Sequence, residues 1–273
     1  MSNNKKQPSR QVEIRELYGA DNQWRVLLNN LIKYAHRTQP RGISCLELMN
    51  YVSVIDMEWP VVSSRIRKLG YKFMAAEAFW ILSGDDRVSE IAPYSAKISQ
   101  FSDDGITFFG AYGPKILGQI DYIVSTLLKD KDSRQAVMTI WRENPPETKD
   151  YPCTVSVHFM IRDNLLYCFD NMRSSDTWLG WPYDVFNFTM LSYVVAAHLR
   201  KHGLDVRPGY LYLNVTSQHL YTKDYDAAKK IIETKGDTRW IQLPELLTLD
   251  QIFEYLATNK NTGGINPWPQ SIK

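Results

Sequence analysis

Residues 151–188 read YPCTVSVHFMIRDNLLYCFDNMRSSDTWLGWPYDVFNF, and the rest of the chain is organised around them. Apolar residues alternate over residues 155–161 and recur from 165 to 169, which predicts two strands. Cys153 stands where the first strand begins, and Arg173 stands just past the end of the second. A hairpin of these two strands brings the cysteine and the arginine close together.

The composition and charge of the chain limit what this stretch can belong to. The chain has 273 residues, of which 44% are hydrophobic and 12% aromatic, enough for a large core. Its 32 Lys and Arg residues barely exceed its 30 Asp and Glu residues, and the two signs are interspersed. This balance argues against extended nucleic-acid binding and favours a small anionic ligand. No apolar run approaches the length of a membrane span, so no membrane partner is expected.

The start of the chain is polar and lysine-bearing, and it lacks the apolar core of a signal peptide. We therefore expect residues 1–20 to form a disordered or extended tail on a cytoplasmic protein. The remainder shows no repeat, flexible linker or shift of composition, so residues 21–273 are predicted to form a single catalytic domain.

The three cysteines are Cys45, Cys153 and Cys168, and their spacing is not that of metal ligands, so no metal is predicted. The odd number fits a reducing compartment. Cys168 lies in an apolar run and is interpreted as structural. A lone cysteine after a proline is more often structural than catalytic, so a chemical role for Cys153 depends on its neighbours.

Helices and strands are predicted to alternate along the rest of the chain. Helices are expected over residues 22–36 (capped by Asp21), 71–82, 115–128 and 185–202, to about Glu233, and once more before residue 265. Further strands are expected over residues 44–49 and 209–215, up to Trp141, and before the last helix. This order predicts an α/β (α+β) domain in which helices cover a large central mixed sheet.

Two further features carry chemistry and leave alternatives open. Glu77 is surrounded by apolar residues in the helix at 71–82, so it either faces solvent or handles protons with a raised pKa. Arg37 and Arg41 flank a proline in one loop, where paired arginines are either solvated or bind phosphate.

The chain resembles the thymidylate synthase family, and within it the deoxycytidylate hydroxymethylase branch. The resemblance covers roughly residues 67–226 and rests on motifs in the right order: Ala76-Glu77-Ala78-Phe79-Trp80 with Gly84-Asp85, Tyr112-Gly113, Asp132-Ser133-Arg134, Pro152-Cys153, Arg173-Ser174 with Asp176, Leu179-Gly180, and His219-Leu220-Tyr221. It implies the thymidylate synthase-like fold, in which a large sheet from each subunit packs against its twin in a homodimer.

The resemblance also implies a role for each matching residue. Cys153 resembles the nucleophile, Glu77 the proton-relay carboxylate, and Tyr112 a hydroxyl near the cysteine. The positions that match ligands of the nucleotide are Arg173 and Ser174 for the phosphate, Arg134 for the phosphate across the dimer, Arg37 or Arg41 for a flexible phosphate arginine, and His219 and Tyr221 for the sugar 3′-hydroxyl. The positions expected at the folate are Asp176, Gly180 and Trp80.

Departures from the synthases point toward the hydroxymethylases. Thr154 and the run Asn171-Met172 match the hydroxymethylases, while Gln135 replaces a second arginine of the family and weakens the expected phosphate clamp. Asp184 stands where the synthases place the asparagine that reads uracil. A carboxyl group suits cytosine, because it accepts from the 4-amino group and can share a proton with N3. The alternative is that Asp184 merely caps the helix starting at 185.

The resemblance therefore implies a one-carbon transferase that converts dCMP or CMP to its 5-hydroxymethyl derivative. Methylenetetrahydrofolate is the expected co-substrate, and DNA modification in a phage-infected host cytoplasm or nucleoside-antibiotic synthesis the expected setting. Access of water to the reaction intermediate favours hydroxymethylation over methylation. Two features of the sequence favour such access: the chain has no tryptophan between Trp80 and Trp141, and it ends with the polar residues 270–273. Folate-dependent methylation of dCMP or dUMP, and a non-catalytic nucleotide-binding or RNA-binding homologue, remain alternatives.

Overall fold

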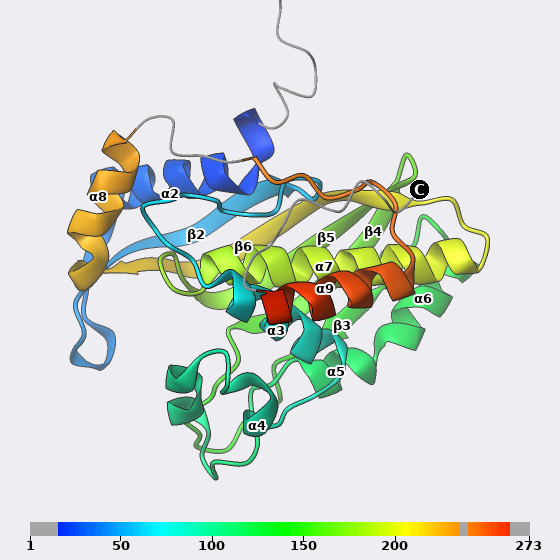
Figure 1. The fold of residues 1–273 in the computed structure, drawn as a ribbon, viewed down its shortest axis with the longest axis horizontal. Helices are drawn as coiled ribbons and strands as arrows, with labels where there is room; N and C mark the ends of the chain where they lie inside the picture. The colour runs from blue at the N-terminus through cyan, green and yellow to red at the C-terminus, as the bar shows by residue number, and fades with distance from the viewer. Residues whose placement is uncertain (1–15, 235–239, 263–273) are drawn as a thin grey trace, which may run out of the picture.

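A six-stranded sheet forms the centre of the protein, whose computed structural model describes residues 16–234 and 240–262 (Figure 1). The strand order is β1-β2-β6-β5-β4-β3. The strands are β1 (His36–Thr38), β2 (Cys45–Asp56), β3 (Val137–Thr139), β4 (Thr154–Arg162), β5 (Leu165–Asp176) and β6 (Arg207–Tyr221). Only β5 and β6 pair in parallel, and every other pairing is antiparallel. The predicted fold class is confirmed.

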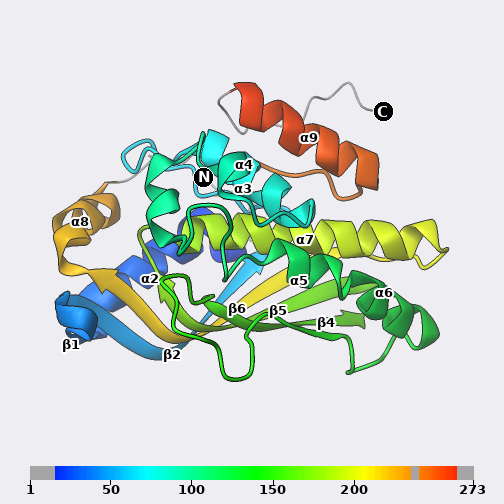
Figure 2. The same ribbon diagram turned by 90° about the horizontal axis from the view of Figure 1, so that it is seen from below.

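Helices pack in layers on one side of this sheet (Figure 2). They are α2 (Ala20–Tyr34), α3 (Tyr71–Leu82), α4 (Val88–Ile91), α5 (Gly113–Leu117), α6 (Ile120–Lys129), α7 (Trp181–Lys201), α8 (Tyr225–Glu233) and α9 (Leu249–Thr262). Helix α7 runs along the sheet, and α3 and α9 pack outside it. Most side chains of α7 are buried, which explains why its sequence is apolar all round. None of the described helices is long and apolar enough to cross a membrane.

The predicted hairpin of β4 and β5 is present. Asp163 and Asn164 turn the chain with φ values of 51° and 59°, which is the backbone that a tight two-residue hairpin requires. Arg173 lies inside β5 rather than just past the strand end, because β5 continues to Asp176. Its backbone N–H donates to the carbonyl of Cys153 at 2.9 Å, so the hairpin does bring these two residues together.

Two helix predictions need correction. Asp21 does not cap the first helix, because α2 begins at Ala20 and Asp21 lies in its first turn, where its carboxylate accepts from Ser63 N–H at 3.1 Å. The helix expected over 115–128 is two helices, α5 and α6. The side chain of Gln119 explains the break: its Nε2 donates to the carbonyl of Thr139 and its Oε1 accepts from Thr139 N–H, so it is tied to β3.

The boundaries around the centre of the chain also differ from the predicted ones. Helix α7 begins at Trp181, with Gly180 as its N-cap and Pro182 in the first turn. Asp184 therefore lies within the first turn and is not the cap, so the capping alternative is wrong. Strand β6 extends to Tyr221 because it pairs with β2 over most of its length. No strand forms over the described residues 240–248, whereas α9 follows as predicted. Of the tail predicted over residues 1–20, residues 1–15 lie outside the described residues, as does the polar end at 270–273. Residues 16–20 correct that prediction, because 16–18 are helical and the buried Ala20 begins α2.

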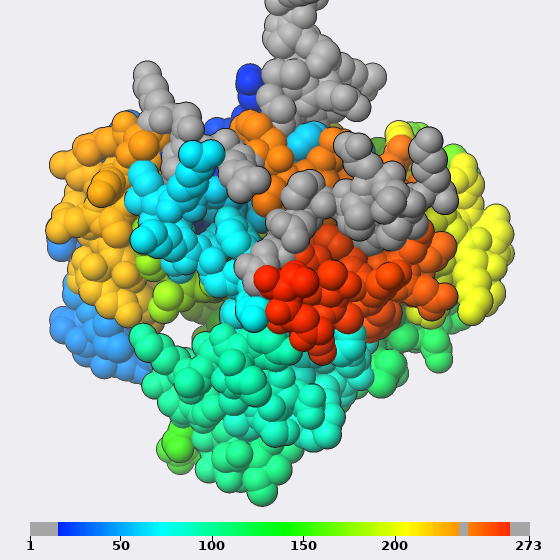
Figure 3. Space-filling view, in the orientation of Figure 1, coloured from blue at the N-terminus to red at the C-terminus, as the bar shows by residue number. Residues whose placement is uncertain are grey.

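Figure 3 shows an opening in one face of the molecule. By their colours, the atoms around the opening belong to α8 (orange), to the chain before α3 (cyan) and to the chain after α3 (teal). Yellow-green atoms of the connection from β5 to α7 also lie at its rim. The opening therefore lies where the carboxyl end of β5 meets the start of α7.

Candidate active site

Cys153 lies at the start of β4 and is held from two directions. Arg173 N–H donates to its carbonyl at 2.9 Å, and the next N–H along, that of Thr154, donates to the Tyr112 hydroxyl at 3.2 Å. Tyr112 reaches this position because Gly113 fits tightly against the end of α3. A Cβ at Gly113 would lie 2.7 Å from the carbonyl oxygen of Asp85, which an ordinary side chain cannot tolerate.

The surroundings of Cys153 favour the protonated thiol. Burial, and the charge of Asp184 when that carboxyl group is ionised, raise its pKa to about 11, while Arg173 acts in the opposite direction. Asp170 and Asp150 raise the pKa further. A thiolate therefore forms more readily when the neighbouring carboxyl groups keep their protons.

The side chain of Arg173 lies at the exposed edge of the site. Its Nε donates to the carbonyl of Pro152 and its Nη2 to that of Tyr151, both at 3.0 Å. The guanidinium also lies 5.5 Å from the ring centre of Trp141. These contacts fix the orientation of the guanidinium group and leave its exposed side available for an anion such as phosphate.

Glu77 projects from α3 toward α7. Asn187 Nδ2 donates to its Oε2 at 2.8 Å, and burial raises the pKa of Glu77 to about 7. The side chain of Glu77 is half-buried and bonded to α7, which favours the proton-handling interpretation over the solvent-facing one. A carboxyl group with this pKa can both accept and give a proton near neutral pH.

Asp184 lies one helical turn before Asn187 on α7. Burial and the charges of Glu77 and Asp176 raise its pKa well above the usual range, which favours the neutral acid. Its Oδ2 points toward Gly180, where a Cβ would stand only 3.3 Å away. The glycine therefore leaves the space that this carboxyl group occupies.

The other predicted ligands lie along the ends of β5 and β6. Ser174 and Asp176 pair in register with Ser217 and His219. His219 is nearly buried, with 9% of its surface exposed, and its ring lies 5.1 Å from that of Tyr221. Asp176 Oδ1 accepts from Trp178 N–H at 2.8 Å and from Leu179 N–H at 3.0 Å.

Four predicted residues are not brought to Cys153. Arg37 lies on β1, Arg41 in the following 3-10 turn with a φ of 54°, and Arg134 just before β3, and all three side chains are exposed. β1 and β3 are opposite edges of the sheet, roughly 24 Å apart at the usual strand spacing. Trp80 packs against Phe108 at 5.7 Å, and its buried Nε1 has no hydrogen-bond partner among the described residues.

Three residues of the site were missed from sequence. Asn187 is the partner of Glu77, and its spacing of three from Asp184 on a helix was the available signal. Arg67 donates through Nη2 to the carbonyl of Trp178 at 2.8 Å and stacks on that ring. Asp170 is fully buried in β5. Its place directly after an apolar run gave no sign of a chemical role.

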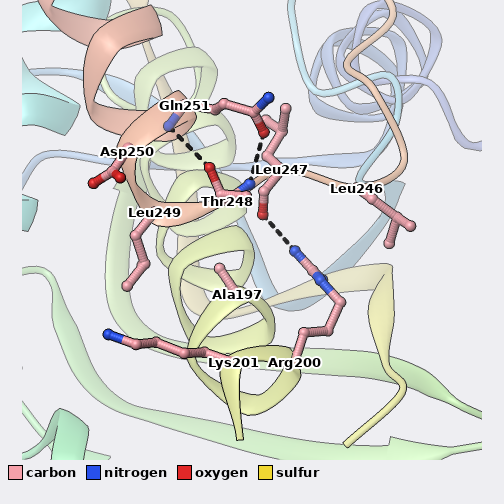
Figure 4. A pocket seen from close by; sticks show the side chains of 9 residues that line it. All are labelled: Ala197, Arg200, Lys201, Leu246, Leu247, Thr248, Leu249, Asp250 and Gln251. Atoms are coloured by element: carbon pink, nitrogen blue, oxygen red, sulfur yellow. Dashed lines mark hydrogen bonds between the residues drawn. The ribbon is translucent and has the colours of Figure 1, made fainter. Parts of the chain in front are cut away.

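The hollow shown in Figure 4 is not this site. It measures about 480 Å³ and lies between the end of α7 and the start of α9. Two of its polar side chains are already paired: Arg200 Nη2 donates to the carbonyl of Leu247, and Gln251 Oε1 accepts from Thr248 N–H at 2.9 Å. None of the predicted catalytic or binding residues lines it.

Comparison with known proteins identifies similar sequences. The family model described as thymidylate synthase matches residues 22–258. A deoxyuridylate hydroxymethyltransferase of Bacillus phage SP01 is 29% identical over 225 residues, covering 74% of this chain and 57% of the phage protein. A protein of the same name from Delftia phage PhiW-14 is 29% identical over 191 residues, covering 64% and 52%.

A cellular protein matches over more of its length. The thymidylate synthase of Buchnera aphidicola subsp. Baizongia pistaciae is 24% identical over 254 residues, covering 86% of this chain and 92% of the synthase. The chain thus spans little more than half the length of the two phage proteins.

Proposed function

Because the chain belongs to the thymidylate synthase family, we propose that it transfers a one-carbon unit to C5 of a pyrimidine nucleoside monophosphate. Methylenetetrahydrofolate is the one-carbon donor that the family uses. Within this class we propose that dCMP or CMP is the substrate and that the product carries a 5-hydroxymethyl group. The observation that carries this choice is the carboxyl group of Asp184, whose charge acts on Cys153 in the same site.

Cys153 is the proposed nucleophile. Addition of its thiolate to C6 of the ring makes C5 an enamine-like carbon that can attack a one-carbon unit. Burial is the largest obstacle to this thiolate, followed by the charge that an ionised Asp184 would carry. Because its surroundings favour the neutral acid, Asp184 keeps or shares its proton with the bound base, and its charge does not oppose the addition.

Asp184 is the proposed reader of the base. Cytosine presents a donor at its 4-amino group and an acceptor at N3, whereas uracil presents an acceptor at O4 and a donor at N3. A neutral carboxyl group accepts with one oxygen and donates with the other, so it matches cytosine in both directions. The same proton stabilises the charge that develops on the ring when the thiolate adds.

Water completes the proposed reaction. Once C5 loses its proton and tetrahydrofolate is eliminated, water adds to the methylene group at C5, and the Cys153–C6 bond then breaks to release the thiolate. Glu77 is the candidate base because burial raises its pKa to about 7. Hydride transfer from the folate at the same point would give a methyl group instead. The sequence provides no tryptophan between Trp80 and Trp141 to shield this carbon from water.

The ends of the nucleotide have candidate ligands. Arg173 and Ser174 are proposed to bind the phosphate, and His219 and Tyr221 the sugar. Trp80, Asp176 and Gly180 are proposed to bind the folate. Two features support that fit: Trp80 has an unpaired Nε1 donor, and the second carboxylate oxygen of Asp176 makes no hydrogen bond with the described residues.

A homodimer is proposed to complete the phosphate site with Arg134 of the second subunit. The sheet face opposite α7 carries stacked aromatic pairs that would form the interface, with ring centres 6.1 Å apart for Tyr167 and Tyr210 and 4.9 Å apart for Phe169 and Tyr212. In the described part of the chain the helices lie on the other side of the sheet (Figure 2).

The second candidate substrate is dUMP. It is favoured by the two phage relatives, both of which are named deoxyuridylate hydroxymethyltransferase. This candidate shares the nucleophile and the addition of water and differs only in the base that Asp184 faces.

Product analysis separates these candidates. The protein is incubated with methylenetetrahydrofolate and each of dCMP, CMP and dUMP, and the nucleotides are separated and weighed by mass spectrometry. The proposal expects a cytidylate that has gained CH₂O. Conversion of dUMP alone would establish the second candidate and remove Asp184 from cytosine selection.

A further inference from the structure

Asp170 is a buried carboxyl group that the proposed reaction leaves unused. Its side chain has 0% exposure, and neither Oδ1 nor Oδ2 has a hydrogen-bond partner among the described residues. Its direct neighbours across the sheet are the apolar Val157 on β4 and Leu213 on β6. Because an unpaired polar group costs free energy in such surroundings, core packing alone favours an apolar side chain at this position.

The sheet register brings Asp170 close to the start of β4. Thr154 pairs with Met172, which lies two residues beyond Asp170 on the same face of β5. Thr154 is also fully buried, and its Oγ1 lacks a hydrogen-bond partner among the described residues. Its hydroxyl nevertheless acts on Asp170 and offsets part of the rise in the pKa of that carboxyl. Thr154 directly follows the nucleophile Cys153.

Charged and titratable groups face Asp170 from each element beside it. Asp184 approaches from α7, Cys153 from the start of β4, and Cys168 from β5 itself. Burial, followed by the charge of Asp184, raises the pKa of Asp170 well above its usual range, so the neutral acid is favoured. An ionised Asp170 would in turn raise the pKa of Cys153 and oppose thiolate formation.

We propose that Asp170 is a positioning residue for Cys153, which holds a proton against the hydroxyl of Thr154 and so fixes the start of β4 behind the thiol. Asp170 touches neither the nucleotide nor the folate in this scheme. The inference rests on the proposed function only in taking Cys153 as the nucleophile.

The test measures alkylation of Cys153 by iodoacetamide as a function of pH, without any substrate. Trypsin cleaves after Lys149 and Arg162, so Cys153 and Cys168 fall on different peptides and mass spectrometry follows each separately. Asp170→Asn keeps the shape and, like the protonated acid, carries no charge. We therefore expect the midpoint of Cys153 alkylation in this variant to stay close to that of the wild type.

Asp170→Leu tests the positioning itself. Leucine removes the contact with Thr154, so it should slow Cys153 alkylation severalfold at high pH and lower kcat more than it changes KM. Asp170→Asn keeps a polar group against Thr154 and should retain most of the wild-type alkylation rate and kcat. If Asp170→Leu does not fold, as judged by thermal denaturation, the midpoint of Asp170→Asn alone decides the question.

Ser192→Ala is the matched control, because Ser192 is a fully buried hydroxyl on α7 that lies beside Cys168 instead. Its midpoint for Cys153 should equal that of the wild type. A lower midpoint in Asp170→Asn would show that the wild-type carboxyl group ionises, and an unchanged alkylation rate in Asp170→Leu would show that it does not position Cys153; either result would overturn the proposal. Since the assay needs no substrate, slower alkylation of Cys153 in Asp170→Leu, in a protein that transfers no one-carbon unit, supports the inference about Asp170 while the proposed function fails.

Discussion

At the scale of single residues, base choice depends on Asp184. Asp184→Asn presents an NH₂ group to the 4-amino group of cytosine, and two donors then face each other in a buried site. Such a mismatch costs about 1–3 kcal/mol, so cytidylate turnover should fall at least about tenfold. Turnover of uridylate should rise, because an amide matches uracil. Steady-state kinetics with both nucleotides measure this crossover.

Stability provides the control for this variant. Gly180 is the N-cap of α7 and no side chain caps the helix, so the variant should unfold near the wild-type denaturant concentration. A variant that still prefers cytidylate by the wild-type margin removes Asp184 from base reading.

Cys153→Ser tests the nucleophile. The hydroxyl fills similar space but is a far weaker nucleophile, so turnover should be abolished while nucleotide binding, measured by calorimetry, stays near the wild-type value. Cys168→Ser is the matched comparison, because Cys168 is buried behind the site and should not be needed for turnover. Substantial residual turnover in Cys153→Ser would exclude the nucleophile role.

Arg173→Ala tests the phosphate site. The phosphate is the same in every nucleotide, so binding of dCMP, CMP and dUMP should weaken to the same extent, by about 2 kcal/mol for a charge-assisted contact. Arg173 also donates to the backbone carbonyls of Pro152 and Tyr151. Arg173→Lys is therefore the control, because it keeps the positive charge but loses the planar guanidinium group that makes both contacts. Loss confined to one base would count against this assignment.

At the scale of elements, the contact between α3 and α7 places an ionisable group where it costs stability. Folding raises the pKa of Glu77 from 4.5 to about 7, so between these values the folded state binds a proton that the unfolded state does not. Stability therefore falls as pH rises from about 4.5 to about 7, by roughly 2–3 kcal/mol.

Glu77→Gln should remove this fall in stability with rising pH. We expect urea denaturation to show the variant close to the wild type at low pH and more stable by roughly 2 kcal/mol above neutral pH. Its amide oxygen can still accept from Asn187, so the contact with α7 is kept. An equal stability difference at both pH values would show that Glu77 is not the group that titrates.

The elements show what sequence periodicity can and cannot predict. The helix at 71–82 was predicted to the residue, because its apolar run is long and has clear ends. The break between α5 and α6 depends on bonds from Gln119 to a strand that is distant in sequence, and no local pattern contains them. The early start of α7 has a local cause instead, since Gly180 N–H donates to the carbonyl of Asp176 four residues before it.

At the scale of the whole molecule, the motifs predicted the inner part of the site but not all of it. Tyr112, Cys153 and Asp184 come together because each lies at the end of a predicted element. Asp170 and Asn187 match no motif, and only the packing of α7 on the sheet shows that they belong. Arg134 lies at a sheet edge, and its proposed phosphate-binding role requires a second subunit.

Subunit complementation tests the proposed dimer. Cys153→Ser and Arg134→Ala chains are each expected to lose most activity. In a mixed dimer one site combines the native Cys153 of one chain with the native Arg134 of the other, so mixing should restore about a quarter of wild-type activity. Without any gain on mixing, Arg134 does not act across a dimer. Sedimentation of Phe169→Asp, which places a charge in the stacked face, checks the interface itself.

The central claim is that water completes the one-carbon transfer to a cytidylate. The most direct measurement incubates the wild-type protein with methylenetetrahydrofolate and dCMP or CMP in heavy-oxygen water, then records the product mass and the oxidation state of the folate. The account predicts a hydroxymethyl cytidylate that carries the heavy oxygen, formed without dihydrofolate. A methylated product with stoichiometric dihydrofolate, or no reaction of either cytidylate, would contradict it.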